Sequence, residues 1–283
     1  MTIRTVTVLG TGVLGSQIAF QTAFSGFEVT AYDISEEALK EARKRFENLA
    51  AVYEKEVEGA GDGKAEQTAA EITLTSDLAE AVRDADLVIE AVPEVLTIKE
   101  QLYTELAKTA PEKTIFASNS STLLPSAMKD YTGRPDRFLA LHFANQVWKF
   151  NTAEIMGTPE TDPGVFQAVV TFASAINIVP IEIHKEKAGY VLNSLLVPLL
   201  HAAMELGEGG YATPEAVDKT WRIGTGAPFG PFQILDVIGL NTPYNILANS
   251  DENSKKLAKW LKDNYIDKGK LGIATGEGFY KYG

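Results

Sequence analysis

His142 and Glu154 are the two residues of this chain best placed to move a proton. Each stands in a run typical of a β-strand, and an antiparallel turn between the two runs would bring the side chains together. A carboxylate bonded to one imidazole nitrogen fixes the tautomer and stabilises the protonated ring, which leaves the other nitrogen to exchange a proton with a substrate oxygen. The pair therefore predicts a general acid/base. The alternative is a histidine that makes only a structural hydrogen bond beside a strand end.

A glycine-rich turn near the N-terminus predicts a nucleotide site. It follows a β-branched run, residues 5–9, and opens an apolar-periodic segment, residues 13–24, which is typical of strand, turn and helix. Gly10 would permit the tight turn, Gly12 the approach of a pyrophosphate, and Gly15 close packing of the helix. The helix N-terminus would then face the phosphates. The residues expected there are Gly10, Gly12, Val13, Leu14 and Gly15.

Asp33 indicates which dinucleotide binds. It ends a second expected strand, residues 28–32, at about the distance from the glycines that this motif requires. A carboxylate there accepts hydrogen bonds from the adenosine ribose hydroxyls and repels a 2′-phosphate. No arginine stands at positions 34–36 to reverse that preference. We therefore expect NAD(H) rather than NADP(H), the alternative being an ordinary strand-turn-helix of an unrelated α/β protein.

Composition narrows the chemistry and the partners. The 283 residues include no cysteine and only three histidines, whose spacing suggests no metal site, so we expect metal-free chemistry. The net charge of -12 argues against nucleic acid or an anionic membrane as a partner. The longest apolar run, residues 190–206, is interrupted by polar residues and is short for a bilayer span, so we expect a buried helix. The chain shows no basic, apolar leader, which predicts a cytoplasmic protein.

The order of the expected elements is typical of an α/β protein. Expected strands are residues 5–9, 28–32, 86–90, 114–117, 138–141, 153–156 and 178–183, and expected helices are residues 13–24, 35–58, 95–110, 163–175, 190–206, 214–222, 231–238 and 254–265. This alternation predicts a doubly wound Rossmann-type sheet followed by an all-helical C-terminal domain. We expect an NAD-binding domain over residues 1–186 and a dimerisation and substrate domain over residues 187–283.

Polar residues after the expected strands are further candidates, because ligands of doubly wound sheets lie at the carboxyl ends of the strands. Three such clusters are residues 90–94 with Lys99, residues 118–121 and residues 142–145. For residues 118–121 the alternative is the N-cap of a helix ahead of Leu123. For Glu94 and Lys99 the alternative is a solvated helix start.

These motifs, in this order, make the chain similar from end to end to the NAD-dependent 3-hydroxyacyl-CoA dehydrogenase family. The runs that carry the resemblance are Gly10–Gly15, Glu90–Glu94, Ser118–Ser121, Leu141–Asn145, Gly189–Pro198, Gly230–Phe232 and Gly276–Tyr282. The resemblance implies NAD as cofactor and a small 3-hydroxyacyl or 3-oxoacyl substrate, possibly linked to CoA. It also implies a homodimer formed by the C-terminal domain.

The resemblance implies roles for individual residues. His142 resembles the general acid/base and Glu154 its partner. Ser121 and Asn193 resemble residues that hold the substrate oxygen. The residues that resemble those around NAD are Asp33, Glu94, Lys99, Asn119, Ser121 and Asn145.

The chain departs from the family pattern at two places. The family usually reads Phe-Phe-Asn-Pro-Val-Pro after the histidine, whereas residues 143–148 read Phe-Ala-Asn-Gln-Val-Trp. This run is similar to the one in bacterial diketoreductases, which reduce β-dicarbonyl compounds with NADH. The stretch that helps the family to hold CoA phosphates is shortened and acidic here, with Glu54, Glu56, Glu58 and Asp62 against Lys55 and Lys64. Carboxylates repel phosphates unless the nearby cations, Arg43, Lys44 and Arg45, compensate.

We therefore expect an NAD(H)-dependent oxidoreductase that interconverts 3-hydroxyacyl and 3-oxoacyl compounds, of the 3-hydroxyacyl-CoA or 3-hydroxybutyryl-CoA dehydrogenase type. His142 and Glu154 would be its acid/base pair. One alternative is a diketoreductase that acts on CoA-free β-dicarbonyl compounds. The alternative of another class is a non-catalytic NAD-binding homologue, which need not keep the four catalytic candidates together.

Overall fold

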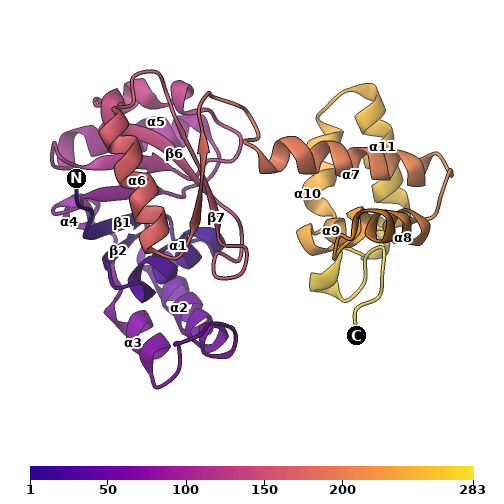
Figure 1. The fold of residues 1–283 in the computed structure, drawn as a ribbon, viewed down its shortest axis with the longest axis horizontal. Coiled ribbons are helices and arrows are strands. Elements are labelled where there is room, and N and C mark those ends of the chain that lie inside the picture. Colours follow the sequence, from indigo (N-terminus) through magenta and orange to yellow (C-terminus); the bar gives the residue numbers. More distant parts are fainter. The chain divides into compact units, whose positions relative to one another are not determined.

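The computed structural model describes residues 1–283, which divide into two compact units, Met1–Val191 and Leu192–Gly283. The first unit is an α/β structure built on a mostly parallel sheet, and the second is helical (Figure 1). The predicted fold class is therefore confirmed. None of the helices combines the length and apolar character that a transmembrane span requires.

An eight-stranded sheet forms the centre of the first unit. Its strands are β1 (Thr5–Leu9), β2 (Glu28–Tyr32), β3 (Thr73–Thr75), β4 (Leu87–Glu90), β5 (Ile115–Ser118), β6 (Phe138–Phe143), β7 (Thr152–Gly157) and β8 (Val179–Ile183). Their order is β3-β2-β1-β4-β5-β6-β7-β8, and neighbours are parallel except β6 and β7, which are antiparallel. The chain changes direction of winding between β1 and β4, where such sheets bind their ligands.

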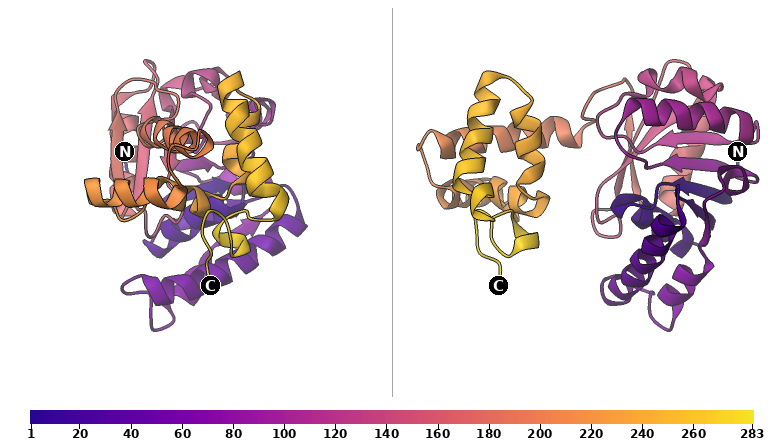
Figure 2. Two further views of the ribbon diagram at one scale, coloured as in Figure 1. Left: turned by 90° about the vertical axis from the view of Figure 1, so that its right-hand side faces the viewer. Right: turned by 180° about the vertical axis from the view of Figure 1, so that it is seen from behind.

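Helices cover both faces of this sheet, because its strands are apolar on both sides. One layer contains α1 (Val13–Phe24), α2 (Glu36–Glu56), α3 (Lys64–Glu71) and α6 (Pro163–Ala175), and the other contains α4 (Leu78–Val82), α5 (Leu96–Thr109) and the 3₁₀ turns within residues 125–137. In β1, Val6 and Val8 pack into the first layer and Leu9 into the second. Figure 1 shows α6 in front of the strands, and the right-hand view of Figure 2 shows the sheet from behind.

The second unit packs five helices around its own core. They are α7 (Leu192–Glu208), α8 (Pro214–Thr225), α9 (Pro231–Ile238), α10 (Asn241–Ala248) and α11 (Glu252–Asn264). Two buried carboxylates hold the C-terminal tail against these helices. Asp218 accepts a hydrogen bond from the Tyr280 hydroxyl at 2.8 Å, and Asp236 accepts one from the Tyr282 hydroxyl at 2.9 Å. Burial, followed by the nearby charge of Asp218, raises the pKa of Asp236, although hydrogen bonds from the backbone N–H groups of Phe279 and Tyr280 and from the Tyr282 hydroxyl act to lower it.

The structure corrects several predicted elements. The prediction misses α3, β3, α4 and α10, each of which is at most eight residues long. The helix predicted from Tyr190 begins at Leu192, because Tyr190 adopts a left-handed φ of 52°. That helix is also not buried throughout, since its buried side chains are Leu200, Ala203 and Met204 whereas Leu195 is 70% exposed.

Candidate active site

The register of β6 and β7 places His142 directly opposite Glu154. Residues opposite one another in an antiparallel pair present their side chains on the same face of the sheet. Nδ1 of His142 lies 3.1 Å from Oε2 of Glu154, and both side chains are buried. With Nδ1 engaged by the carboxylate, Nε2 is the nitrogen that can exchange a proton with a substrate. The geometry suits the acid/base role predicted for this pair.

Glu94 organises the loop that follows β5. Its Oε1 accepts hydrogen bonds from the Ser120 hydroxyl and from the backbone N–H groups of Ser121 and Thr122. Burial alone would favour the neutral acid, but the bonds from Ser120 and Thr122 and the charge of Lys99 lower the pKa of Glu94 to about 2. Glu94 is therefore a carboxylate at physiological pH and holds the backbone that carries Ser121.

Lys99 is not at a solvated helix start, so that alternative is wrong. Its side chain is 1% exposed, and Nζ lies 2.5 Å from Glu90 Oε1 and 3.3 Å from Glu94 Oε2. The buried Glu90 carboxylate also accepts hydrogen bonds from the hydroxyls of Ser118 and Tyr103. In this geometry Lys99 supports the two carboxylates, and its place beside NAD stays a prediction.

The loop after β5 does not cap an α-helix, so the alternative that residues 118–121 form a helix N-cap is removed. Ser120 Oγ accepts a hydrogen bond from the backbone N–H of Leu123, but the next element is a 3₁₀ turn, Pro125–Ala127. Asn119 instead ties β5 to β6, since its Oδ1 accepts a hydrogen bond from the backbone N–H of Phe143 at 2.9 Å.

Two further predicted residues lie apart from this loop. Asn145 is exposed after β6, and its Oδ1 accepts a hydrogen bond from Gln17 Nε2 of α1 at 2.9 Å. Asn193 lies in the first turn of α7, in the second unit. Its predicted contact with the substrate oxygen stays a prediction.

The glycine turn has the shape that a pyrophosphate requires. Gly10 has φ 92°, and a Cβ there would lie 2.7 Å from the carbonyl oxygen of Ala91. A Cβ at Gly15 would overlap the carbonyl oxygen of Gly10. Gly12 differs, because a Cβ there would point into open space. Gly12 is also the N-cap of α1. No side chain caps the first backbone N–H groups of this helix, so its exposed start is open to an anion. These residues fit NAD.

Asp33 already shapes this turn. Its Oδ2 accepts hydrogen bonds from the backbone N–H and the hydroxyl of Thr11, at 2.8 and 2.6 Å. Its Oδ1 accepts one from the backbone N–H of Ile34 at 2.8 Å. The half-buried carboxylate therefore lies at the end of β2, beside the glycines, where an adenosine ribose is expected.

Sequence reasoning missed two residues that contact predicted ones. Gln17 binds Asn145, and Tyr190 stacks on His142 with ring centroids 4.5 Å apart. Tyr190 stands inside a motif run, so its position in that run was the available signal. Gln17 gave none, because it is one polar residue in an apolar helix.

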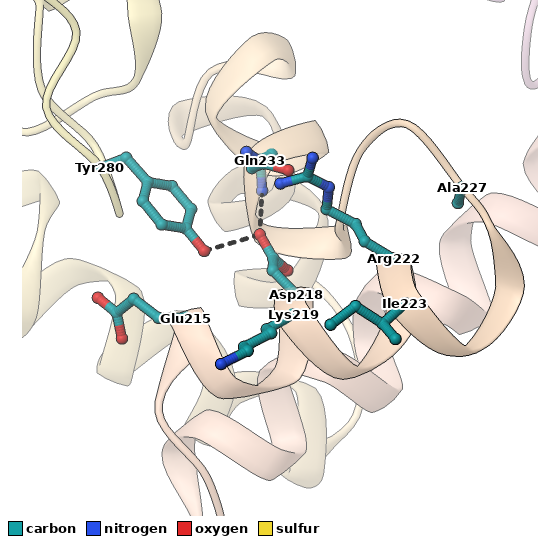
Figure 3. A pocket seen from close by; sticks show the side chains of 8 residues that line it. All are labelled: Glu215, Asp218, Lys219, Arg222, Ile223, Ala227, Gln233 and Tyr280. Carbon is teal, nitrogen blue, oxygen red and sulfur yellow. Dashed lines mark hydrogen bonds between the residues drawn. The ribbon is translucent and has the colours of Figure 1, made fainter.

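A separate pocket of about 390 Å³ lies in the second unit (Figure 3). It is lined by Glu215, Asp218, Lys219, Arg222, Ile223, Ala227, Gln233 and Tyr280. Figure 3 shows that Asp218 accepts hydrogen bonds from the Tyr280 hydroxyl and from the backbone N–H of Gln233. None of the predicted site residues lines this pocket.

Comparison with known proteins settles the family. Residues 5–187 match the model "3-hydroxyacyl-CoA dehydrogenase, NAD binding domain", and residues 189–282 match "3-hydroxyacyl-CoA dehydrogenase, C-terminal domain". The chain belongs to the 3-hydroxyacyl-CoA dehydrogenase family. The predicted resemblance and the NAD cofactor are thereby confirmed. As a member of this family the protein is an NAD-dependent dehydrogenase acting on CH–OH groups, which disfavours the non-catalytic alternative.

Individual members of the 3-hydroxyacyl-CoA dehydrogenase family differ in their likeness to this chain. The human mitochondrial hydroxyacyl-coenzyme A dehydrogenase is 37% identical over 288 residues, covering 99% of this chain and 91% of that protein. The structure of (S)-3-hydroxybutyryl-CoA dehydrogenase from Ralstonia eutropha is 28% identical, covers both chains fully and has a TM-score of 0.84. A structure of a diketoreductase, described by its dual catalysis of dicarbonyl compounds, is 68% identical, covers both chains fully and has a TM-score of 0.98.

Proposed function

We propose that this protein is a diketoreductase, which reduces CoA-free β-dicarbonyl compounds with NADH. The observation that carries the proposal is the 68% identity over the full length to a diketoreductase. The human CoA-dependent relative is 37% identical. A CoA-free substrate is thereby favoured over a 3-hydroxyacyl-CoA substrate. We also propose a cytoplasmic location.

The site residues divide the reduction between them. The glycine turn and Asp33 would hold NADH, which would supply the hydride for the carbonyl carbon. His142 Nε2 donates a proton to the carbonyl oxygen, and Glu154 stabilises the imidazolium before transfer. Ser121 is proposed to hold that oxygen, and the same role for Asn193 stays a prediction. Glu94 fixes the backbone of Ser121 through the bonds described above.

The loop after His142 supports a substrate without CoA. Trp148, which stands where the family usually has proline, donates a hydrogen bond from Nε1 to Glu56 Oε2 at 2.9 Å. It therefore ties the loop to the acidic end of α2. Three cations of α2 are already engaged: Lys44 pairs with Glu41, while Arg43 and Arg45 donate to backbone carbonyls of Ala69 and Thr11. Residues 54–64 keep a negative balance, with four carboxylates against Lys55 and Lys64, which disfavours CoA phosphates there.

The proposal is tested by initial rates with NADH on three substrates: a 3,5-diketo ester, acetoacetyl-CoA and acetoacetyl-pantetheine. We expect the highest kcat/KM with the diketo ester. We also expect the pantetheine thioester, which lacks the CoA phosphates, to react nearly as well as the CoA thioester. A loss of more than about a hundredfold on removing the phosphates would contradict the proposal, because it would show that they are recognised.

Asp33 is expected to set the choice of cofactor. NADH should exceed NADPH by at least about tenfold in kcat/KM, because the carboxylate repels a 2′-phosphate. Asp33→Ala should remove this preference and weaken NADH binding. The matched control is Thr11→Val, which loses the hydroxyl bond to Asp33 but keeps the carboxylate, and should keep the preference. Equal kcat/KM for the two cofactors in the wild type would refute this role.

We infer that α7 takes part in a homodimer. Its exposed apolar side chains are Leu192, Leu195, Val197 and Leu206. Apolar side chains gathered on one helix of a second unit that has its own core are typical of a protein interface. Light scattering at micromolar concentration should give the mass of two chains, and Leu195→Glu should give one. A monomeric wild type would rule the inference out.

A further inference from the structure

Two consecutive residues at the end of the first unit contact both members of the proposed acid/base pair. The phenol ring of Tyr190 stacks on the imidazole of His142, with centroids 4.5 Å apart and planes inclined by 20°. The backbone N–H of Val191 donates a hydrogen bond to Glu154 Oε1 at 2.8 Å. Oε2 of the same carboxylate faces His142. Tyr190 and Val191 therefore hold one member of the pair each, the imidazole and the carboxylate.

Tyr190 is itself held firmly. Its side chain is 2% exposed, and its hydroxyl donates a hydrogen bond to the backbone carbonyl of Ser120 at 2.6 Å. Its φ of 52° lies in the left-handed region, which bulky side chains rarely adopt and which persists only where surrounding contacts hold it. The ring is thus anchored on the residue that precedes Ser121.

We propose that Tyr190 is a positioning residue of this reaction, whose stacked ring fixes the plane of the His142 imidazole. A single hydrogen bond at Nδ1 leaves an imidazole able to tilt about that bond. A stacked ring prevents the tilt and keeps Nε2 aimed at one point, and an aromatic face also favours the imidazolium form. The inference rests on the proposed role of His142, whichever carrier the substrate bears.

The hydroxyl of Tyr190 stays protonated while its ring stacks on His142. Burial, followed by the charges of Glu94, Glu154 and Glu90, raises the pKa of Tyr190. The same neutral ring therefore faces His142 before and after proton transfer.

The test compares an aromatic variant with two apolar ones. Tyr190→Phe keeps the ring and loses the bond to Ser120, so we expect kcat within about threefold of wild type. Tyr190→Leu and Tyr190→Met lose the ring, so we expect kcat to fall by about 10- to 100-fold, with KM for NADH changed less than about twofold, because small misplacements of reacting groups have effects of this size. The ring protons of His142 should also move downfield in the NMR spectra of both apolar variants but not in Tyr190→Phe. Near wild-type kcat in both apolar variants, or an equal loss in all three, would overturn the inference.

A second substitution separates this inference from the proposed function. In a His142→Gln background, Tyr190→Leu should lower kcat further by less than about twofold, since residues that act through one group are not additive. A full additional loss would show that Tyr190 acts independently of His142 and would overturn the inference. If His142→Gln is itself fully active, the proposed role of His142 fails. If His142→Gln is inactive and the apolar Tyr190 variants are active, the inference about Tyr190 fails by itself.

Discussion

His142→Gln is expected to lower kcat by about 10²- to 10⁴-fold and to leave NADH affinity almost unchanged. A placed acid/base contributes a factor of this size, and glutamine can hydrogen-bond but cannot supply a proton. The measurement is steady-state kinetics with a reactive substrate, together with a fluorescence titration of NADH. Retention of most of the activity would show that another residue carries the proton.

The partner carboxylate provides the companion measurement. Glu154→Gln should also slow turnover, because an amide can still bond to Nδ1 but does not stabilise the imidazolium by charge. The double variant should be little worse than His142→Gln alone, because the two residues act as one unit. Losses that multiply would contradict a shared role.

The direction of the reaction decides the sign of its pH dependence. Reduction consumes a proton from the imidazolium, so its rate should fall as pH rises. Oxidation needs the neutral ring, so its rate should rise with pH. Profiles measured in both directions should lose these opposite slopes in His142→Gln. Parallel slopes in the wild type would be inconsistent with a single acid/base at His142.

Gly12→Ala is expected to weaken NADH binding by about 10- to 100-fold while the melting temperature stays within about 2 °C of wild type. A Cβ at Gly12 meets no protein atom within 4 Å, and its φ of −62° suits alanine, so folding should not suffer. The same Cβ would occupy the space through which the pyrophosphate approaches the backbone.

A matched control is Gly61→Ala, at another glycine with nothing within 4 Å and no left-handed φ. It should change neither property. If Gly12→Ala bound NADH as tightly as Gly61→Ala does, the pyrophosphate would have to lie elsewhere.

The sequence predicted the first unit well where a pattern has a direct physical cause. The strand and helix around the glycine turn were predicted with their observed bounds, because the β-branched run, the glycines and the apolar period all agree. The spacing of His142 and Glu154 likewise predicted two strands able to bring them together, and the structure pairs them in register.

What the sequence did not predict depends on tertiary contacts. The burial of Lys99 follows from Glu90 and Glu94 on a neighbouring strand and loop, which local patterns do not encode. The stack of Tyr190 on His142 depends on a backbone turn at Tyr190, which makes the expected helix begin two residues later, at Leu192. Helix propensity alone continues through that tyrosine, so pattern reasoning could not place the turn.

The central claim is that hydride passes to a ketone carbon while His142 protonates the oxygen. It is tested most directly by reducing the 3,5-diketo ester with NADH that carries deuterium at the transferable C4 position, and locating the label by NMR. The account predicts one deuterium on the carbon that bears the new hydroxyl group, with the hydroxyl hydrogen drawn from solvent. A product without deuterium at that carbon, formed with full consumption of the labelled NADH, would contradict it.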